Sequence, residues 1–406
     1  MKTNTHRVFK LASICLLTPI PPLVLSSCST TAPTVDNIEI TAKCTHNLEY
    51  GGCLIDIKPQ DFEEIGFQLG DGLNIEFSNN QILNEIPYFN GFYGYNGDAI
   101  LLSWGSSLFL TRKNSLADVW KELGLTDEAT AKISIAKKEQ YYDIQKKLNI
   151  SYTNNRDDYD SDEQYANFRA VNGGNLKQDV LYRGVTPISP KTVGTRYEYT
   201  EQLISDNGIT FPINLSNSED QVMQLVDNYN DTSLSYYRSL IRKKGKLSSN
   251  SLAHSYYAHH YSIITNDLDC RLSVADLFRT IIANSDEDSK FYVHCEEGKD
   301  RTGAICILIE SLCGCSYDEI LEDYMMSFEN LYHLNWTDNA SQLETIVKYY
   351  FNELVYMLTL DETRSETYAN ADFKSIAIKY LSQDETASGM LTDDEIGQII
   401  TLFSRP

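Results

Sequence analysis

The decapeptide from His294 to Gly303, HCEEGKDRTG, gathers residue types that can bind and attack an anion. It follows a short apolar stretch, 290–293, and precedes a longer one, 304–312, so we expect the order strand, tight loop and helix. Such a loop turns successive backbone N–H groups into one small concavity, and the helix dipole adds positive potential there. The pattern therefore predicts a site for a tetrahedral oxyanion.

Two side chains of this loop can carry out a covalent reaction. Cys295 stands at its base, where N–H donors and a guanidinium favour the thiolate over the thiol, so that the sulfur can attack phosphorus. Arg301, six residues later, can fold back across the loop and grip two phosphoryl oxygens with its planar fork, which a lysine could not do. We interpret Cys295 as a nucleophile and Arg301 as the phosphoryl ligand.

Three further residues of the loop fit supporting roles. Gly298 permits close backbone approach and an unusual φ, and Gly303 lets the following helix pack tightly behind the loop. Thr302 is placed to hydrogen-bond the Cys295 sulfur and to stabilise it when it leaves the phosphoenzyme.

The loop belongs to a predicted α/β unit, residues 165–406. Short apolar strands at 208–215 and 290–293 alternate with helical segments, and a long helix is expected from about Arg301. Near the C-terminus, Thr392 followed by Glu395 predicts a capped helix over 391–403. We therefore expect a central sheet flanked by helices.

Residues 36–136 are expected to form a separate β-rich unit. The segments 73–77 and 133–135 alternate in polarity with the two-residue period of half-buried strands. Ser115 is expected to cap a short helix that reaches Leu123. A compact β-barrel or a β-sandwich fits this pattern best. The acidic segment 137–164 is expected to be an exposed linker to the α/β unit.

Residues 1–27 have the features of a targeting segment. Basic residues precede an apolar stretch that prolines interrupt and that is too short for a spanning helix. Leu25-Ser26-Ser27-Cys28 then resembles the bacterial lipobox, in which the cysteine is lipidated. We expect a mature extracytoplasmic lipoprotein, on the cell surface or the periplasmic face, that is attached to the membrane only through Cys28, with 28–35 as a tether. A simple cleaved signal is the alternative.

The charge of the chain excludes some partners. A formal net charge of −23 argues against nucleic acid or an anionic membrane surface as the main partner. An acidic protein that handles an anion must concentrate positive potential locally, and the decapeptide is the expected source of it.

The cysteines and histidines outside the loop predict no metal site and no cofactor. The sequence has no pair of C-x-x-C motifs, and the region of His254, His259 and His260 is interpreted as an aromatic helix because tyrosines surround them. Cys44 and Cys53 lie close together in sequence and could form a disulfide. Three cysteines in an apolar run are expected to be buried small hydrophobes: Cys306, Cys313 and Cys315.

The decapeptide resembles the signature of the cysteine-dependent protein-tyrosine phosphatase superfamily, and its Gly-Lys-Asp-Arg-Thr-Gly form is similar to the bacterial atypical tyrosine phosphatase family. Supporting matches extend the resemblance over about residues 150–405; they are Asn167-Phe168-Arg169 with Gly173, Leu181-Tyr182-Arg183-Gly184 and Glu322-Asp323-Tyr324-Met325. The resemblance implies a two-step reaction through phosphocysteine, without a metal, on phosphotyrosine and sometimes on phosphoserine, phosphothreonine or phosphoinositides. It implies that substrate is held by the loop and one further arginine: His294, Glu296, Glu297, Gly298, Lys299, Thr302, Gly303 and Arg183.

The general acid that protonates the leaving oxygen has two candidates. Asp300 is the first choice by analogy with the family. The alternative is Asp267 or Asp269, on a predicted loop 26 to 28 residues before Cys295.

The chain departs from the family pattern in two places. The family usually carries Asp-Leu-Arg after its early strand, whereas this chain has Asn214-Leu215-Ser216, with one positive charge fewer. Glu296 and Glu297 are unusual beside an anionic substrate, because inward-facing carboxylates would disfavour a thiolate. A glutamate after the cysteine is also similar to the tyrosine-phosphatase-like inositol phosphatases, and Lys299 could meet a second phosphate. An inositol-phosphate phosphatase and a non-catalytic phosphate-binding surface module therefore stay open.

The β-rich unit has a resemblance of its own. Gly70-Asp71-Gly72 and the run from Pro87 to Tyr93 resemble the β-barrel C-terminal domain of the S-adenosylmethionine hydroxide adenosyltransferases. That family completes its nucleoside site with a partner domain that this chain lacks. A structural or substrate-presenting role is therefore expected in preference to adenosine binding.

Overall fold

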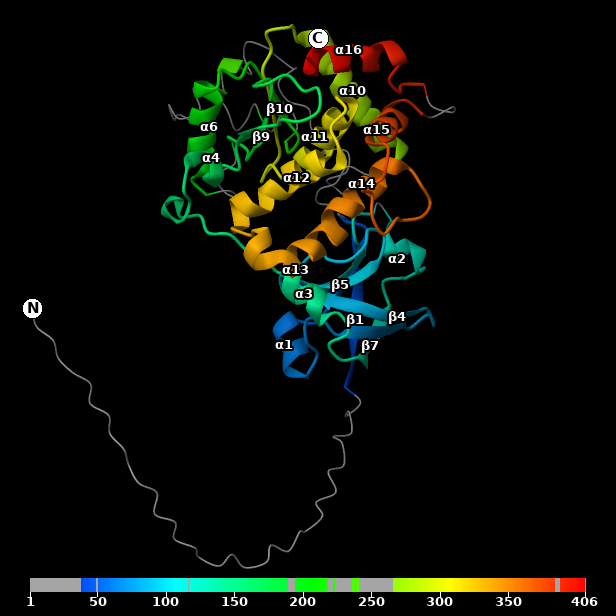
Figure 1. Ribbon diagram of the computed structural model, residues 1–406. Coiled ribbons are helices and arrows are strands. Elements are labelled where there is room, and N and C mark those ends of the chain that lie inside the picture. The colour runs from blue at the N-terminus through cyan, green and yellow to red at the C-terminus, as the bar shows by residue number, and fades with distance from the viewer. Residues whose placement is uncertain are drawn as a thin grey trace, which may run out of the picture. The chain divides into compact units, whose positions relative to one another are not determined.

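The computed structural model describes residues 38–48, 50–115, 117–188, 194–217, 222, 236–237, 239–240, 266–383 and 388–405 (Figure 1). All of these belong to one compact unit, residues 37–406. The targeting segment, Cys28 and the tether lie outside the described residues, as do His254, His259 and His260. The expectations for those residues therefore stay predictions.

Seven strands close into a barrel in the N-terminal part of this unit, as the alternating patterns predicted. In β3, Leu73, Ile75 and Phe77 are buried while Glu76 is exposed, which is the two-residue period of a barrel strand. The order around the barrel is β1-β2-β6-β5-β4-β3-β7, and the strands are β1 Glu39–Asn47, β2 Gly52–Ile55, β3 Gly72–Phe77, β4 Ile82–Phe89, β5 Ala99–Trp104, β6 Ser107–Arg112 and β7 Thr130–Lys137.

Two short helices, α1 (Pro59–Glu64) and α2 (Val119–Glu122), accompany the barrel. The predicted start of α2 at Ser115 is wrong, because Asp118 caps the helix by accepting the Lys121 N–H at 3.3 Å. The Ser115 hydroxyl instead accepts the Ala117 N–H at 3.1 Å, which closes a turn before the helix begins.

The segment 137–164, expected to be an exposed linker, is folded against the rest of the chain. It contains α3 (Tyr142–Leu148), η1 (Arg156–Asp158) and the start of α4 (Asp162–Tyr165). Leu148 and Tyr159 are buried, and the Tyr159 hydroxyl donates to the Leu331 carbonyl at 3.1 Å. The acidic residues of the segment lie at the surface, whereas its apolar and aromatic residues anchor it, so charge alone was a poor guide to its structure.

The predicted α/β unit is built on a sheet with the strand order β10-β11-β9-β8. β11 (Phe291–His294) lies between β10 (Phe211–Asn214) and β9 (Leu181–Gly184) and is parallel to both, while β8 (Arg169–Ala170) is antiparallel to β9. Phe291 and Val293 belong to one hydrophobic cluster and Tyr292 to another, so both faces of β11 are buried. The strand therefore delivers Cys295, the next residue, to the carboxyl edge of a covered sheet.

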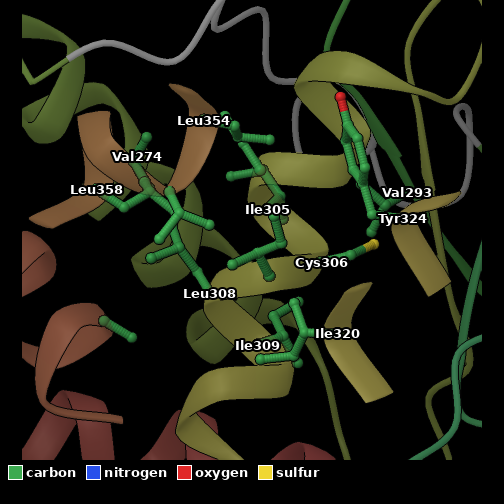
Figure 2. Packing of buried hydrophobic residues seen from close by; sticks show 14 of the residues in the cluster. Val274, Val293, Ile305, Cys306, Leu308, Ile309, Ile320, Tyr324, Leu354 and Leu358 are labelled. Atoms are coloured by element: carbon green, nitrogen blue, oxygen red, sulfur yellow. The ribbon is translucent and has the colours of Figure 1, made fainter. Parts of the chain in front are cut away.

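Helices cover this sheet, as the alternation of strands and helices predicted (Figure 1). The helix after the decapeptide, α11 (Asp300–Leu312), is buried at every residue from Thr302 to Leu312. Figure 2 shows Ile305, Leu308 and Ile309 of α11 surrounded by side chains of α10, α12 and α14. The other helices are α6 Arg196–Asp206, α10 Leu268–Asn284, α12 Tyr317–Tyr332, α13 Trp336–Ile346, the π-helical turn η4 Val347–Phe351, α14 Asn352–Thr359, α15 Phe373–Ser382 and α16 Asp393–Phe403.

The predicted C-terminal helix is confirmed. Thr392 and Glu395 form a capping box in which each side chain binds the other residue's backbone N–H. Within the described ranges, no helix has both the length and the apolar character needed to cross a membrane.

The cysteines outside the decapeptide are buried thiols. Cys306, Cys313 and Cys315 are buried, as predicted from their apolar surroundings. Cys44 and Cys53, which the sequence allowed to form a disulfide, are both buried free cysteines in this structure.

Candidate active site

The decapeptide forms a tight loop between β11 and α11, as predicted. Gly298 has a φ of +68°, and a Cβ added there would lie 2.2 Å from the Gly184 carbonyl oxygen. Glycine is therefore required at this position both for its backbone conformation and for the close approach of β9. Gly303 has a related role, because a Cβ there would lie 2.8 Å from the Tyr324 ring of α12.

Four consecutive carbonyls of the loop, from Glu296 to Lys299, accept hydrogen bonds from donors outside the loop. The donors come from β9, from a residue two positions before β8 and from the segment after β9. The bonds run from Thr186 N–H to Glu296 (3.1 Å), from Asn167 Nδ2 to Glu297 (2.9 Å), and from Arg183 Nη2 to Gly298 (2.9 Å) and Lys299 (3.1 Å). The loop carbonyls thus all turn toward the body of the protein.

This arrangement sets the direction of the loop N–H groups. A trans peptide points its carbonyl and the next N–H in opposite directions, and no described peptide bond is cis. The N–H groups of residues 297–300 therefore face away from the donors that hold the carbonyls. Gly298 has a left-handed backbone conformation and Lys299 a right-handed one, a sequence that makes consecutive N–H groups converge. The dipole of α11, which begins at Asp300, adds positive potential at the same place. The loop can bind a tetrahedral anion.

A buried ion network fixes Arg183, the main donor to the loop. Arg183 is fully buried and donates through Nη1 to Asp323 Oδ2 of α12. Asp323 Oδ1 accepts from Arg169 Nε at 2.8 Å, and Arg169 Nη1 donates to Asn167 Oδ1 at 2.7 Å. Arg183, predicted to bind substrate, therefore lies behind the loop and positions it.

This network leaves net positive charge behind the loop. Although burial opposes it, the charges of Arg169 and Arg183 hold the pKa of Asp323 below its ordinary value, so one carboxylate faces two guanidinium groups. The nearby Glu310 does not cancel the excess, because burial and then the Asp323 charge raise its pKa well above the ordinary value. The network thus adds to the positive potential at an anion site in an acidic chain.

Cys295 directly follows β11, and Arg301 lies in the first turn of α11. The predicted grip of Arg301 on a phosphoryl group stays a prediction. Cys295 is only 4% exposed. Arg301 Nη1 donates to the Leu215 carbonyl at 2.8 Å, so the segment that replaces Asp-Leu-Arg of the family anchors this guanidinium through its backbone. The Asn214 side chain shapes that segment by accepting the Ser216 N–H at 2.8 Å.

Thr302 does not make its predicted contact. Its hydroxyl is buried and has no hydrogen-bond partner among the described residues, so the bond to the Cys295 sulfur is not formed in this structure.

His294 is a structural residue of the loop's base and does not face a substrate. It is fully buried, stacks on Tyr292, and its Nε2 lies 3.0 Å from the Tyr237 hydroxyl. Burial, with a smaller contribution from the Arg301 charge, lowers the pKa of His294 to about 3. The imidazole is therefore neutral at physiological pH.

Glu297 and Lys299 neutralise each other beside the end of α12. Lys299 Nζ lies 3.1 Å from Glu297 Oε2 and 2.9 Å from the Tyr332 hydroxyl, beside the rings of Phe328 and Tyr350. Against the effect of burial, Lys299 lowers the pKa of Glu297, which stays ionised. The expected contact of Lys299 with a second phosphate is not favoured, because its ammonium is already paired with the Glu297 carboxylate.

The two candidates for the general acid lie in different places. Asp300 lines a cavity of about 270 Å³ together with Lys299, helices α12 and α14, and residues of the barrel. Asp267 caps α10 and lines a separate cavity with Arg364, and the described lining of that cavity includes no residue of the decapeptide. Asp269 lies in the first turn of α10. The structure thus brings Asp300, and neither alternative, to a cavity beside the loop.

Sequence reasoning missed the roles of Asn167, Arg169 and Asp323. They occur in the matched motifs, but no local pattern connects them with the loop. The available signal was their polarity, since charged residues in otherwise buried segments must find partners. Within the described part of the chain, no group of three or more histidine, cysteine, aspartate or glutamate residues could hold a metal ion.

Comparison with known protein families gives a match over most of the α/β part. The model of a family described as the tyrosine phosphatase family matches residues 156–399, more than half of the chain. The matched range includes the whole loop, the sheet and the ion network. No curated protein matches the chain.

The buried His294 predicts how stability depends on pH. Its pKa is about 3 when folded and near 6.5 when unfolded, so the unfolded state binds more protons between these values. The free energy of unfolding should fall as pH drops from about 6.5 to about 3, by up to about 1.4 kcal/mol per pH unit. Denaturant titrations should show a shallower acid slope for His294→Asn, and the wild-type slope for the exposed control His333→Asn. Equal slopes for wild type and His294→Asn would contradict this account.

Proposed function

Because the chain belongs to the tyrosine phosphatase family, we propose that it hydrolyses phosphomonoesters, with phosphotyrosine preferred, through a phosphocysteine formed on Cys295. The observation that supports this most is that four consecutive loop carbonyls are hydrogen-bonded toward the body of the protein. It directs the amides of residues 297–300 to the opposite side of the loop, where in this proposal the phosphoryl group binds and Cys295 attacks it. Those donors match the charge that develops on phosphoryl oxygens in the transition state.

In the first step the Cys295 thiolate attacks phosphorus. The S–P bond forms, the bond from phosphorus to the ester oxygen breaks, and Asp300 gives that oxygen its proton. In the second step water attacks phosphorus and passes a proton to the Asp300 carboxylate. The S–P bond then breaks, which releases inorganic phosphate and restores the thiolate.

Arg301 holds the phosphoryl oxygens in this proposal. One of its N–H groups is already bound to the Leu215 carbonyl, which fixes the guanidinium plane and leaves further N–H groups for oxygens. Arg183 and Asp323 are positioning residues, since they act through the loop backbone.

Turnover of p-nitrophenyl phosphate tests the proposed function. Wild type should release p-nitrophenolate, and a chelator should not change the rate because the proposed route uses no metal. Cys295→Ser should abolish turnover while it still binds inorganic phosphate, because the hydroxyl is a weaker nucleophile than the thiolate. The matched control is Cys306→Ser, a buried cysteine of the same helix-and-loop region, which should retain activity if it folds. A correctly folded wild type without turnover would contradict the proposal.

Comparison of two substrates tests the choice of Asp300 as general acid. Asp300→Asn should lower kcat for phosphotyrosine by about 10²–10⁴-fold, since the phenolate of tyrosine needs a proton as it leaves. The loss with p-nitrophenyl phosphate should be much smaller, because p-nitrophenolate leaves without one. Asp267→Asn and Asp269→Asn should leave both rates within about twofold of wild type. The reverse pattern would move the role to α10.

Two rival functions have distinct outcomes. The pairing of Lys299 with Glu297 leaves no lysine of the loop for a second phosphate, so inositol polyphosphates are a less favoured substrate class. A non-catalytic phosphate-binding module would give no phosphocysteine on acid quench, whereas a phosphatase would.

We also propose, from the lipobox-like sequence, that the mature chain begins at a lipidated Cys28 and is membrane-anchored outside the cytoplasm. Cys28→Ala should move the protein from the membrane to the soluble fraction, and unchanged fractionation would contradict the anchor. The resemblance of the barrel to the adenosyltransferase domain stays a prediction.

A further inference from the structure

The cavity beside Asp300 is built from two distant parts of the chain. The barrel contributes Phe92 and Tyr93, from the connection between β4 and β5, and Lys113, which follows β6. The α/β part contributes Tyr324 of α12 and Tyr350 of η4. Asp300 and Lys299 of the loop complete the lining. The barrel therefore reaches the immediate surroundings of the loop.

Hydrogen bonds hold the barrel side of this cavity in place. Lys113, which is only 2% exposed, donates to the Tyr349 carbonyl at 2.9 Å and to the Gly94 carbonyl. The Asn96 N–H donates to Glu353 Oε2 at 2.6 Å, and the Asn96 amide donates to the Glu353 carbonyl at 3.3 Å. These bonds link the barrel to η4 and α14 through buried polar groups, which is a fixed interface and not a loose contact between domains.

Tyr93 lies close to the loop. Burial raises the pKa of Tyr93 to about 12, while the charge of Lys299 acts in the opposite direction, so the phenol stands within the field of a loop residue. Its ring packs against Phe89 with centroids 5.4 Å apart, and its hydroxyl donates to Asn90 Oδ1 at 3.1 Å. The barrel strand β4 and the turn after it thus set the position of the ring.

The two lysines and the glutamate that line the cavity already have partners, and Asp300 lies 3.9 Å from Lys299. Lys113 donates to two carbonyls, Lys299 is paired with Glu297, and Glu353 Oε1 lies 2.8 Å from Arg364 Nε. Besides Asp300, the lining includes the amides of Asn96 and Asn114 and the aliphatic side chains of Leu148, Ile150 and Leu354. Most of the remaining surface comes from aromatic residues: Phe92, Tyr93, Tyr324, Tyr332, Tyr349 and Tyr350. Such a lining favours a planar aromatic group over a charged or strongly hydrated one.

We propose that this cavity is the leaving-group pocket and that the barrel, through Tyr93 and Phe92, selects phosphate esters of aromatic alcohols. The inference rests on the proposed function, in which Asp300 is the general acid. A general acid must touch the leaving oxygen. The group attached to that oxygen must then lie on the Asp300 side of the loop. The barrel is accordingly a part of the substrate site, and its residues determine specificity without taking part in the chemistry.

Binding to the full chain that carries Cys295→Ser tests the pocket without turnover. The two probes are phosphotyrosine and phosphoserine, which share the phosphate and differ in the aromatic ring. Adding Tyr93→Ala should raise the Kd for phosphotyrosine about tenfold, since it removes an aromatic contact, and should change the Kd for phosphoserine less than about twofold. Tyr142→Ala, an exposed tyrosine of α3 outside the cavity lining, is the matched control and should change neither value.

A second variant guards against loss of folding. Tyr93→Leu keeps apolar bulk against Phe89 and should raise the Kd for phosphotyrosine by about threefold, in the same direction as Tyr93→Ala. Thermal unfolding confirms that each variant is folded.

Equal losses for the two probes, or no loss for phosphotyrosine in a folded variant, would overturn the inference, because Tyr93 would then only support the fold or not reach the ligand. Failure of the proposed function appears separately, as absent turnover by wild type.

Discussion

The carboxylate of Asp323, shared between two buried guanidinium groups, is the interaction on which the loop depends. It orients Arg183, and Arg183 holds two of the four loop carbonyls that turn away from the anion side. Removing one partner of such a network leaves an uncompensated buried charge, which typically costs about 3–5 kcal/mol. The network therefore contributes little net stability. It constrains the geometry of the loop, because any other loop arrangement would break the bonds from Arg183 to two of its carbonyls. Position 298 is part of the same constraint, because only glycine fits there beside the Gly184 carbonyl.

The distribution of charge explains how an acidic chain can hold an anion. The formal charge of −23 is spread over the molecule, whereas two arginines and one ionised carboxylate lie directly behind the loop. Glu310, which could have cancelled that excess, is kept neutral by burial and by the Asp323 charge. Glu297, a loop carboxylate that was unexpected beside an anion, is bound by Lys299 and by the hydroxyls of Tyr152 and Tyr332. Positive potential at the loop is thus a local property that overall composition neither supplies nor prevents.

Sequence reasoning succeeded where the deciding interactions are local. The loop, its flanking strand and helix, the β-barrel pattern and the capping box at Thr392 each depend on residues within a few positions of one another. It failed where the partner is remote. Arg183 and Asp323 are 140 residues apart, and Asn167 is 130 residues from the loop carbonyl that it binds. For this reason Arg183 was assigned to substrate, whereas the partners it has in the structure are Asp323 and the loop backbone. The same limit applies to Lys299, whose pairing with Tyr332 requires α12 to be in place, and to the segment 137–164, whose buried Tyr159 outweighs its acidic neighbours.

The most direct test of this account is the affinity of the Cys295→Ser chain for inorganic phosphate, measured with and without Asp323→Asn. The substitution keeps the shape of the side chain but removes the charge that orients Arg183, so the loop carbonyls lose their donor and the amides lose their alignment. We predict that Asp323→Asn weakens phosphate binding at least about tenfold in protein that is still folded, or about 1.4 kcal/mol. Asp361→Asn, which breaks the exposed pair with Lys379, should leave the affinity unchanged. Full phosphate affinity in a folded Asp323→Asn variant would contradict the claim that this buried carboxylate holds the loop in its anion-binding form.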